Sequence, residues 1–420
     1  MSAMPEPLPT LPGALEEPTV RVRSRYIGAV FLANFAIVLA FFTPIQNLLP
    51  RLAEQADPTS KEAALAWITG AGAAASIIFN PLAGALSDRT TSRLGRRKPW
   101  VLYGSIAGAL GIAALTLQST VLGLAVVWFF CQATINGSYA AVTATIPDQV
   151  PVPQRGVVSG WVGVASTVGV VAGVMLVTVI VTDLKLGILL TAALLVLLCL
   201  PFVLGLKDIT LDRANRPEFH LGSWIRGFWV SPREYPDFGW AWLTRFLMML
   251  GNSMATLYLL FWLKDEVHYS DPGFGQFILI GLYAFGTLVT AVVFGYISDR
   301  SGRRKIYVIW ATIVMAVSAV ILAFFPNFPA AMLAALILGL GYGSYLAVDQ
   351  ALVTQVLPAA IDRGRDLGVI NIANSAPQVL APVIAAPIVT TALGYTGLYL
   401  LTAFVTLLSA VLVSRIKSVP

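Results

Sequence analysis

Gly84-Ala-Leu-Ser-Asp88-Arg89, followed shortly by Gly95-Arg96-Arg97-Lys98, is a stretch that occurs twice in this chain. The second copy is Gly295-Tyr-Ile-Ser-Asp299-Arg300, followed by Gly302-Arg303-Arg304-Lys305. Each copy lies between two long apolar segments, and the copies are about half of the 420-residue chain apart. The repeat predicts a membrane protein built from two homologous halves, which is the usual plan of an alternating-access transporter.

The composition agrees with a membrane protein. Hydrophobic residues make up 57% of the chain and charged residues 11%, whereas a soluble protein has about 25% charged residues. The formal net charge is +6, but the basic residues lie in loops beside apolar spans, which favours membrane orientation over nucleic-acid binding. His220 and His268 share no metal-ligand motif, and Cys131 and Cys199 lie within apolar segments. We therefore predict no metal site and buried structural thiols.

Apolar runs of helix length predict twelve membrane-spanning helices. The predicted spans are 26–49, 62–87, 99–118, 121–146, 156–181, 185–206, 239–263, 274–298, 304–325, 328–353, 366–391 and 394–414. The predicted fold class is all-α, a polytopic membrane protein whose 12 transmembrane helices form two pseudo-symmetric six-helix bundles. The predicted parts are a disordered cytoplasmic tail (1–25), an N-terminal bundle (26–206), a cytoplasmic linker (207–238), a C-terminal bundle (239–415) and a cytoplasmic tail (416–420).

The distribution of lysine and arginine predicts the orientation. Of the 27 basic residues, Arg51, Lys61, Lys185 and Lys264 fall on one side of the predicted spans and Arg245 falls within a span. All others lie on the side of the two termini. Because cytoplasmic loops carry the excess of positive charge, both termini are predicted to be cytoplasmic.

A second internal repeat supports the duplication. Gly137-Ser138-Tyr139 in the fourth span corresponds to Gly343-Ser344-Tyr345 in the tenth, and Gln149-Val150 corresponds to Gln355-Val356 at the same offset. The fourth and tenth spans are equivalent if spans one to six and seven to twelve are parallel repeats.

The repeated loop resembles the signature loop of the major facilitator superfamily, with the tighter spacing of that family in the second copy. The longer first copy, which continues to Lys98-Pro99, and the segment from Asp366 to Gln378 resemble the glycoside and sucrose cation symporters of that superfamily. The resemblance covers about residues 26–415. It implies a secondary transporter without enzymatic activity, and the chain contains no Walker loop that would bind ATP.

The resemblance assigns a cytoplasmic gate to the two loops. A carboxylate such as Asp88 at the end of a helix can pair with arginine or with the positive end of a neighbouring helix. The gate residues so assigned are Gly84, Asp88, Arg89, Gly95, Arg96, Arg97 and Asp148 in the first half, and Gly295, Asp299, Arg300, Gly302 and Arg303 in the second. Thr354 stands where the first half has Asp148, so we expect the second gate to be weaker. The alternative is that these arginines serve only to orient the protein.

Two charged residues fall deep within predicted spans, Arg245 on the seventh and Asp349 on the tenth. At a rise of 1.5 Å per residue both lie roughly 9–12 Å deep, and an isolated charge near the bilayer centre costs at least about 2.5–3.5 kcal/mol. We therefore expect them to pair. We predict Asp349 and Arg245 as proton-coupling residues, because an acid in a changing dielectric can exchange a proton between two states. The alternative is a permanent salt bridge between two helices.

Amide and tyrosine side chains form stripes on several spans, for example Gln132, Asn136 and Tyr139 at helical spacing. Such groups supply the donors, acceptors and stacking faces that a neutral polyhydroxylated substrate needs. The predicted substrate-binding residues are Asn34, Gln132, Asn136, Tyr139, Asn252, Tyr258, Tyr342, Tyr345, Asn371, Asn374 and Gln378. The alternative is hydrogen bonding between helices, worth about 0.6 kcal/mol per bond.

Together these features favour a proton-coupled symporter for a sugar or glycoside in the plasma membrane, driven by the proton gradient, without a cofactor and functional as a monomer in the lipid bilayer. Sodium stays open as the coupling ion, although the first span lacks an acid. The main alternative is proton-coupled efflux of drugs or small metabolites. Val174 stands where the superfamily's antiporter motif has a proline, which weighs against it. A non-transporting sensor of the same fold is less favoured because the gate loop is duplicated.

Overall fold

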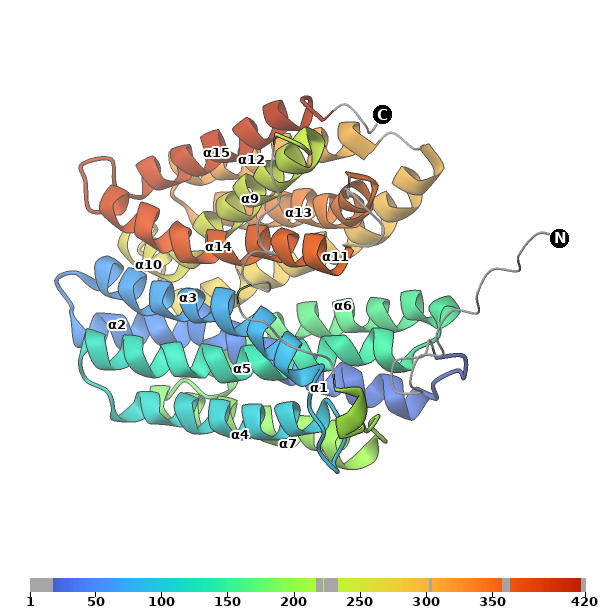
Figure 1. Ribbon diagram of the computed structural model, residues 1–420. Coiled ribbons are helices and arrows are strands. Elements are labelled where there is room, and N and C mark those ends of the chain that lie inside the picture. Colours follow the sequence, from blue (N-terminus) through green and yellow to red (C-terminus); the bar gives the residue numbers. More distant parts are fainter. Residues whose placement is uncertain (1–17, 217–221, 223–232, 302–303, 357–362, 417–420) are drawn as a thin grey trace.

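The structure of the chain is a computed structural model, and it describes residues 18–216, 222, 233–301, 304–356 and 363–416. The first bundle contains α1 (Ser24–Thr43), α2 (Leu49–Ala56), α3 (Lys61–Ser87), α4 (Lys98–Ala114), α5 (Val121–Gln149), α6 (Val152–Met175) and α7 (Leu184–Gly205). The second contains α9 (Pro236–Leu257), α10 (Leu259–Asp265), α11 (Pro272–Ser301), α12 (Arg304–Phe324), α13 (Phe328–Val356), α14 (Arg363–Val389) and α15 (Gly394–Val413). The two bundles lie against each other along one side (Figure 1).

Long apolar segments fold as helices because a backbone in lipid must satisfy its N–H and C=O groups within the segment. In the described part of the chain, eleven helices are long and apolar enough to cross a membrane, and the pair α9 and α10 makes a twelfth. The predicted fold class, an all-helical membrane protein with twelve spans, is therefore confirmed. Cys131 and Cys199 are buried and free, as expected.

The helix ends differ from the predicted spans where helices change geometry. The first span is predicted to end at residue 49. In the structure, α1 is followed by a π-helical segment, Pro44–Leu48, which continues into α2 and extends the helix to Ala56. The seventh span is bent by 41° between α9 and α10. The bend lies at Tyr258, whose backbone leaves helical geometry at φ −98° and ψ 12°. A hydropathy pattern does not detect such a break, because Leu257 and Leu259 on both sides are as apolar as the rest of the span.

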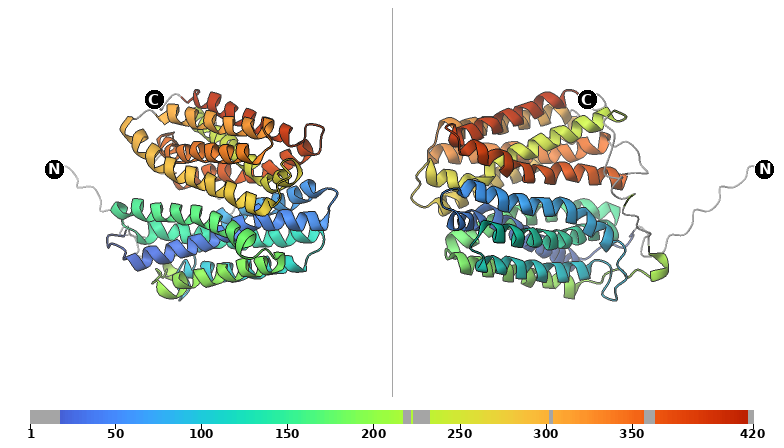
Figure 2. Two further views of the ribbon diagram at one scale, coloured as in Figure 1. Left: turned by 180° about the vertical axis from the view of Figure 1, so that it is seen from behind. Right: turned by 60° about the vertical axis from the view of Figure 1, so that its left-hand side comes forward.

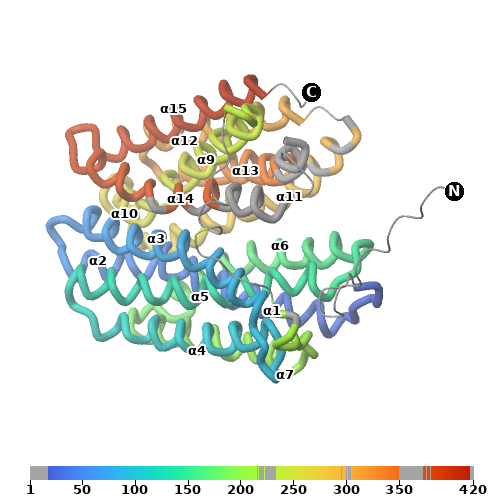
Figure 3. The backbone as a smooth tube through the Cα atoms, viewed as in Figure 1, coloured from blue at the N-terminus to red at the C-terminus, as the bar shows by residue number. Residues whose placement is uncertain are grey.

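Most of the lysine and arginine residues in the described part of the chain lie toward one end of the molecule. The basic end, as we call it, is where α1 and α9 begin and α3 and α15 end, and the far end is the opposite one, where α2 and α10 lie (Figures 1 and 2). At the far end, α2 and the start of α3 lie next to α10 of the second bundle, which the tube in Figure 3 shows. The predicted N-terminal tail is described from residue 18 onward, and α1 begins at Ser24.

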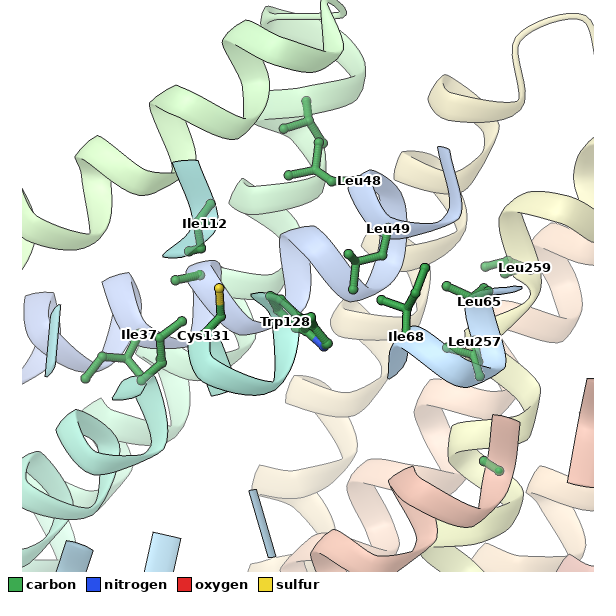
Figure 4. Close-up of a cluster of buried hydrophobic side chains, with 14 of the residues drawn as sticks. Ile37, Leu48, Leu49, Leu65, Ile68, Ile112, Trp128, Cys131, Leu257 and Leu259 are labelled. Carbon is green, nitrogen blue, oxygen red and sulfur yellow. The ribbon is translucent and has the colours of Figure 1, made fainter. Parts of the chain in front are cut away.

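A single apolar cluster joins the two bundles at the far end. Leu65 and Ile68 of α3 lie beside Leu257 and Leu259 of the bent span (Figure 4). Burying a leucine or isoleucine side chain contributes about 1.5–3 kcal/mol when it leaves water, but a membrane interior is itself apolar, so close packing is the larger part of the gain here. The bundles are therefore held together at this end.

Candidate functional site

A cavity of about 1390 Å³ lies between the two bundles. Its described walls come from α1, α3, α5 and α6 on one side and mainly from α9, α11, α13 and α14 on the other. Toward the basic end it reaches Gly84 and Asp88, and the side chain of Asp88 is 54% exposed. Because the far end is closed by contacts between the bundles, the cavity opens at the basic end.

The wall formed by the first bundle carries a hydrogen-bonded strip of amides and hydroxyls on α3 and α5. Asn136 donates from Nδ2 to Ser76 Oγ at 2.8 Å and to Gln132 Oε1 at 3.0 Å. Ser76 donates to Gln132 Oε1 at 2.9 Å, and Asn80 Nδ2 donates to Asn136 Oδ1 at 3.2 Å. All four residues line the cavity. The bonds fix the side chains, so the strip is preorganised for a polar ligand.

The wall formed by the second bundle carries a pair of tyrosines. The rings of Tyr283 and Tyr342 stack with centroids 5.8 Å apart and an angle of 28° between their planes. Tyr283 donates its hydroxyl to Asn252 Oδ1 at 3.2 Å. The approach of α11 to α13 depends on Gly339, because a Cβ at that position would collide with the Tyr283 backbone. This close packing sets the two rings side by side at the cavity.

The predicted substrate-binding residues divide into two groups. Those that line the cavity are Gln132, Asn136, Tyr139, Asn252, Tyr342, Asn374 and Gln378. Three others, Asn34, Tyr258 and Tyr345, are buried and are not among the described lining residues, so their binding role stays a prediction, and the side chain of Asn371 lies outside the described residues. Among the residues that the prediction missed are Ser76, Asn80 and Tyr283. Ser76 and Asn80 have the same i, i+4 spacing as Gln132 and Asn136. This polar pattern is hard to recognise on α3, because most residues before it are alanine or glycine.

Each of these three residues has other surroundings in the structure. Asn34 is fully buried and donates to Ser166 Oγ at 2.8 Å, so it joins α1 to α6. Tyr258 lies at the bend of the seventh span and donates to the Glu62 carbonyl at 3.2 Å, at the far end. Tyr345 is fully buried beside the second-bundle core. Asn34 and Tyr258 thus make hydrogen bonds between helices.

Arg245 and Asp349 form an ion pair behind the cavity wall. Arg245 Nη1 lies 3.1 Å from Asp349 Oδ2, and the two side chains are 4% and 6% exposed. Neither of these two atoms makes a hydrogen bond within the described residues, so the contact is electrostatic. Arg245 also donates from Nε to Asn374 Oδ1 at 2.7 Å. Neither charged residue is among the described lining residues, but Asn374 is, so it connects the cavity to the ion pair.

The far end is closed by ion pairs between the bundles. Lys61 Nζ of α3 lies 2.7 Å from Asp265 of α10, and Lys264 Nζ lies 2.5 Å from Glu54 of α2. The Tyr395 hydroxyl donates to Asp265 Oδ2 at 2.9 Å. Each bundle thus supplies one basic and one acidic side chain, and each of these pairs with the opposite charge on the other bundle.

Beneath these ion pairs, a buried amide contact joins the π-helical segment Pro44–Leu48 to α11. Asn47 donates from Nδ2 to Gln276 Oε1 at 3.0 Å, and Gln276 donates from Nε2 to the Gln46 carbonyl at 2.6 Å. Gln276 is fully buried and Asn47 is 1% exposed. Gln46 lines the cavity, so this contact lies next to it.

The first copy of the repeated loop forms a charge cluster at the basic end. Arg97 donates from Nε to Asp148 at 2.8 Å and from Nη2 to Asp88 at 2.5 Å, and its Nη1 contacts Ser87 Oγ. Arg96 Nη2 lies 2.7 Å from Asp148. Burial lowers the pKa of Arg97, but Asp148 and Asp88 outweigh it, so the pKa is raised overall. The cluster ties the ends of α3, α4 and α5 together.

The second copy of the loop is described only in part. Gly302 and Arg303 lie outside the described residues. Gly295 and Asp299 are described only as part of the α11 backbone. The guanidinium of Arg300 lies over the ring of Tyr296, 5.0 Å from its centroid. In the first copy, Arg89 lies half-buried at the start of the loop.

Comparisons with known proteins assign the fold and the family. The model of the Major Facilitator Superfamily matches residues 30–282 and 241–420. The crystal structure of the nucleoside transporter NupG (D323A mutant) is similar with a TM-score of 0.75 at 11% identity, covering 93% of this chain and 99% of that one. A POT family transporter in complex with a thioalcohol conjugated peptide gives 0.75 at 13% identity, covering 93% and 96%. At these identities the structural likeness shows the fold alone.

Curated relatives match over shorter segments. The General alpha-glucoside permease of Schizosaccharomyces pombe is 29% identical over 126 residues, which cover 26% of this chain and 22% of the relative. The Arabinose-proton symporter of Bacillus subtilis is 33% identical over 99 residues, which cover 24% and 21%. Each match thus spans about a fifth of the relative's length. Since the family model covers most of the chain and the fold agrees with it, the chain belongs to the Major Facilitator Superfamily and is a multi-pass membrane transporter of a small molecule, not an enzyme.

Proposed function

We propose that this transporter carries a sugar or glycoside by proton-coupled symport, through alternating access. In this proposal it lies in the plasma membrane, with the basic end on the cytoplasmic side. It would do so as a monomer, since the cavity is formed within one chain. The excess of lysine and arginine at the basic end supports this orientation. The cavity then faces the cytoplasm in the conformation described above.

The observation that carries the substrate class is the hydrogen-bonded strip of amides and hydroxyls in a cavity whose lining is otherwise mainly apolar and almost without charge. Among its described lining residues, Asp88 at the mouth is the one with a charged side chain. The amide strip of α3 and α5 offers donors and acceptors to hydroxyl groups, and the Tyr283–Tyr342 pair offers an apolar face to a sugar ring. Much of the remaining lining is apolar, as it would be in a cavity for lipophilic drugs, and it is the hydrogen-bonded strip that favours a sugar over drug efflux.

Proton coupling is supported by the connection between the cavity and the ion pair. Asn374 lines the cavity and accepts from Arg245, which in turn pairs with Asp349. A substrate that displaces Asn374 would change the surroundings of the buried pair and with them the proton affinity of Asp349. The two curated relatives described above are named as a permease for α-glucosides and a proton symporter for arabinose, which supports this proposal.

The proposal is tested by counterflow in proteoliposomes. Proteoliposomes that contain the purified protein are loaded with unlabelled maltose or arabinose, and uptake of the labelled sugar is followed. A nucleoside and a lipophilic cation serve as comparison substrates. We expect counterflow with at least one sugar, together with alkalinisation of the outer medium when sugar is added. Counterflow with the nucleoside or the cation alone would overturn the sugar assignment, and uptake that follows a sodium gradient but no pH gradient would overturn proton coupling.

The tyrosine pair leads to a prediction about affinity. Tyr342→Ala is expected to raise KM for the sugar about three- to tenfold, because an aromatic stacking contact is worth about 0.5–1.5 kcal/mol. Tyr342→Phe is the matched control and keeps KM within about twofold, because the hydroxyl makes only a 3.8 Å contact to Met249 Sδ in the described residues. Counterflow at several sugar concentrations measures both. Equal KM values for the two variants would contradict the stacking role.

The gate cluster leads to a second prediction. Asp88→Asn is expected to lower the maximal transport rate about tenfold while the protein still inserts and folds, because the amide no longer attracts the buried Arg97 guanidinium. Fluorescence-detected size exclusion measures insertion, and counterflow measures the rate. A well-expressed variant with normal counterflow would show that the charges serve orientation alone.

A further inference from the structure

Asp208 belongs to the linker between the bundles, yet it lies against the first gate loop. Its Oδ2 accepts from the backbone N–H of Arg97 at 2.6 Å and from that of Lys98 at 2.9 Å. In the same segment, the Ile209 carbonyl accepts from the N–H of Arg96 at 2.9 Å. Three successive backbone amides of the gate loop are therefore bound by two residues of the linker.

These bonds supply a cap that α4 lacks within its own segment. The first N–H groups of a helix have no partner inside the helix, and Arg97 at the N-cap position gives no capping side chain. A carboxylate at this end is also stabilised by the helix dipole. Asp208 meets both needs from more than 100 residues away in the sequence.

The glycine of the loop fits the same arrangement. Gly95 has φ +104°, in the region that favours glycine. A Cβ added to Gly95 would fall on the side chain of Asp208. Glycine is thus required at this position both for the backbone conformation and for the space that Asp208 occupies.

The consequence concerns the gate arginines. Arg96 and Arg97 project from the backbone that the linker holds, and both side chains contact Asp148. Gln149, the neighbour of Asp148, approaches Asp208 Oδ1 at 3.4 Å through Nε2. We propose that Asp208 is a positioning residue of the gate: it fixes the start of α4 so that Arg97 reaches Asp88 and Asp148 together. The inference rests on the gate role under the proposed function.

Hydrogen exchange and counterflow on the full-length protein test the inference. In Asp208→Ala, the amides of Arg97 and Lys98 are expected to exchange at least tenfold faster, and transport is expected to fall as in Arg97→Gln. The double variant Asp208→Ala/Arg97→Gln should transport no worse than Arg97→Gln, because both changes remove the same arrangement. Asp208→Asn should retain slow exchange, since its amide oxygen still accepts from the helix. Asp212→Ala is the matched control, an exposed acid of the same linker.

The possible failures are distinguishable. Unchanged exchange in Asp208→Ala would overturn the capping role. Faster exchange with normal transport, in a protein where Arg97→Gln is impaired, would show that Asp208 caps a helix without positioning the gate. Normal transport by Arg97→Gln itself would overturn the gate assignment of the proposed function, and the inference with it.

Discussion

Asp349→Leu is expected to lower the stability of the folded transporter by about 3–5 kcal/mol, because it leaves the Arg245 guanidinium buried without its counter-charge. Thermal unfolding in detergent, followed by tryptophan fluorescence, measures the loss. The milder Asp349→Asn retains the volume of the side chain and the bond from Arg245 to Asn374, so it is expected to fold. It should catalyse counterflow but no longer accumulate sugar against a gradient, since the group that exchanges the proton is gone.

The double variant Arg245→Gln/Asp349→Asn separates coupling from a structural role. Replacing both partners of a buried pair removes the unpaired charge, so stability is expected to return close to that of the native protein. If the pair couples protons, this stable variant exchanges sugar without moving protons. Accumulation with normal alkalinisation in the double variant would mean that the pair serves packing alone and that the coupling acid lies elsewhere.

The fold was predictable because the features that define it are long and repeated. Twelve apolar segments and the duplicated loop require no knowledge of packing, and the charge asymmetry of the loops adds an expected orientation. What the sequence did not predict is local geometry that depends on neighbours. The bend at Tyr258 has no proline or glycine to indicate it, and the extension of α1 into α2 passes through polar residues such as Arg51 that end a hydropathy window.

The sequence predicted which helix faces carry the site, but not which residues at the border of such a face reach the cavity. Gln132, Asn136 and Tyr139 share one face of α5, and all three line the cavity. Tyr342 and Tyr345 are three residues apart, about 60° around the helix, and that difference is enough to put one ring at the cavity and the other in the core. The packing of α13 against α9, α11 and α12 decides which ring reaches the cavity, and the sequence pattern of α13 does not contain that information.

Lys61→Glu is expected to shift the transporter away from the described conformation by about a factor of ten. The change removes the 2.7 Å contact to Asp265 and brings a new carboxylate close to that acid and to Glu54, which lies 3.8 Å from the native Lys61 Nζ. An exposed pair contributes at most about 1 kcal/mol, but these side chains are 13%, 30% and 31% exposed, and charge reversal adds repulsion to the loss. A tenfold shift corresponds to about 1.4 kcal/mol.

Distance measurements between spin labels give the readout. Labels at Thr59 and Ser270, exposed residues on opposite bundles at the far end, should move apart in Lys61→Glu. The two native cysteines are buried and do not compete for a hydrophilic label. The charge-swapped pair Lys61→Asp/Asp265→Lys should restore the short distance, and Lys185→Glu, an exposed lysine on α7, should leave it unchanged.

The sugar-transport rate should follow the same order, because each transport cycle has to close the far end once. Lys61→Glu would then be slow, while the swapped pair would recover a substantial part of the rate. If Lys61→Glu leaves the label distance short, the ion pairs contribute little and closure depends on the apolar contact of Leu65 and Ile68 with Leu257 and Leu259. Ile68→Ser would in that case open the far end, whereas under ion-pair control it leaves the label distance close to that of the native protein.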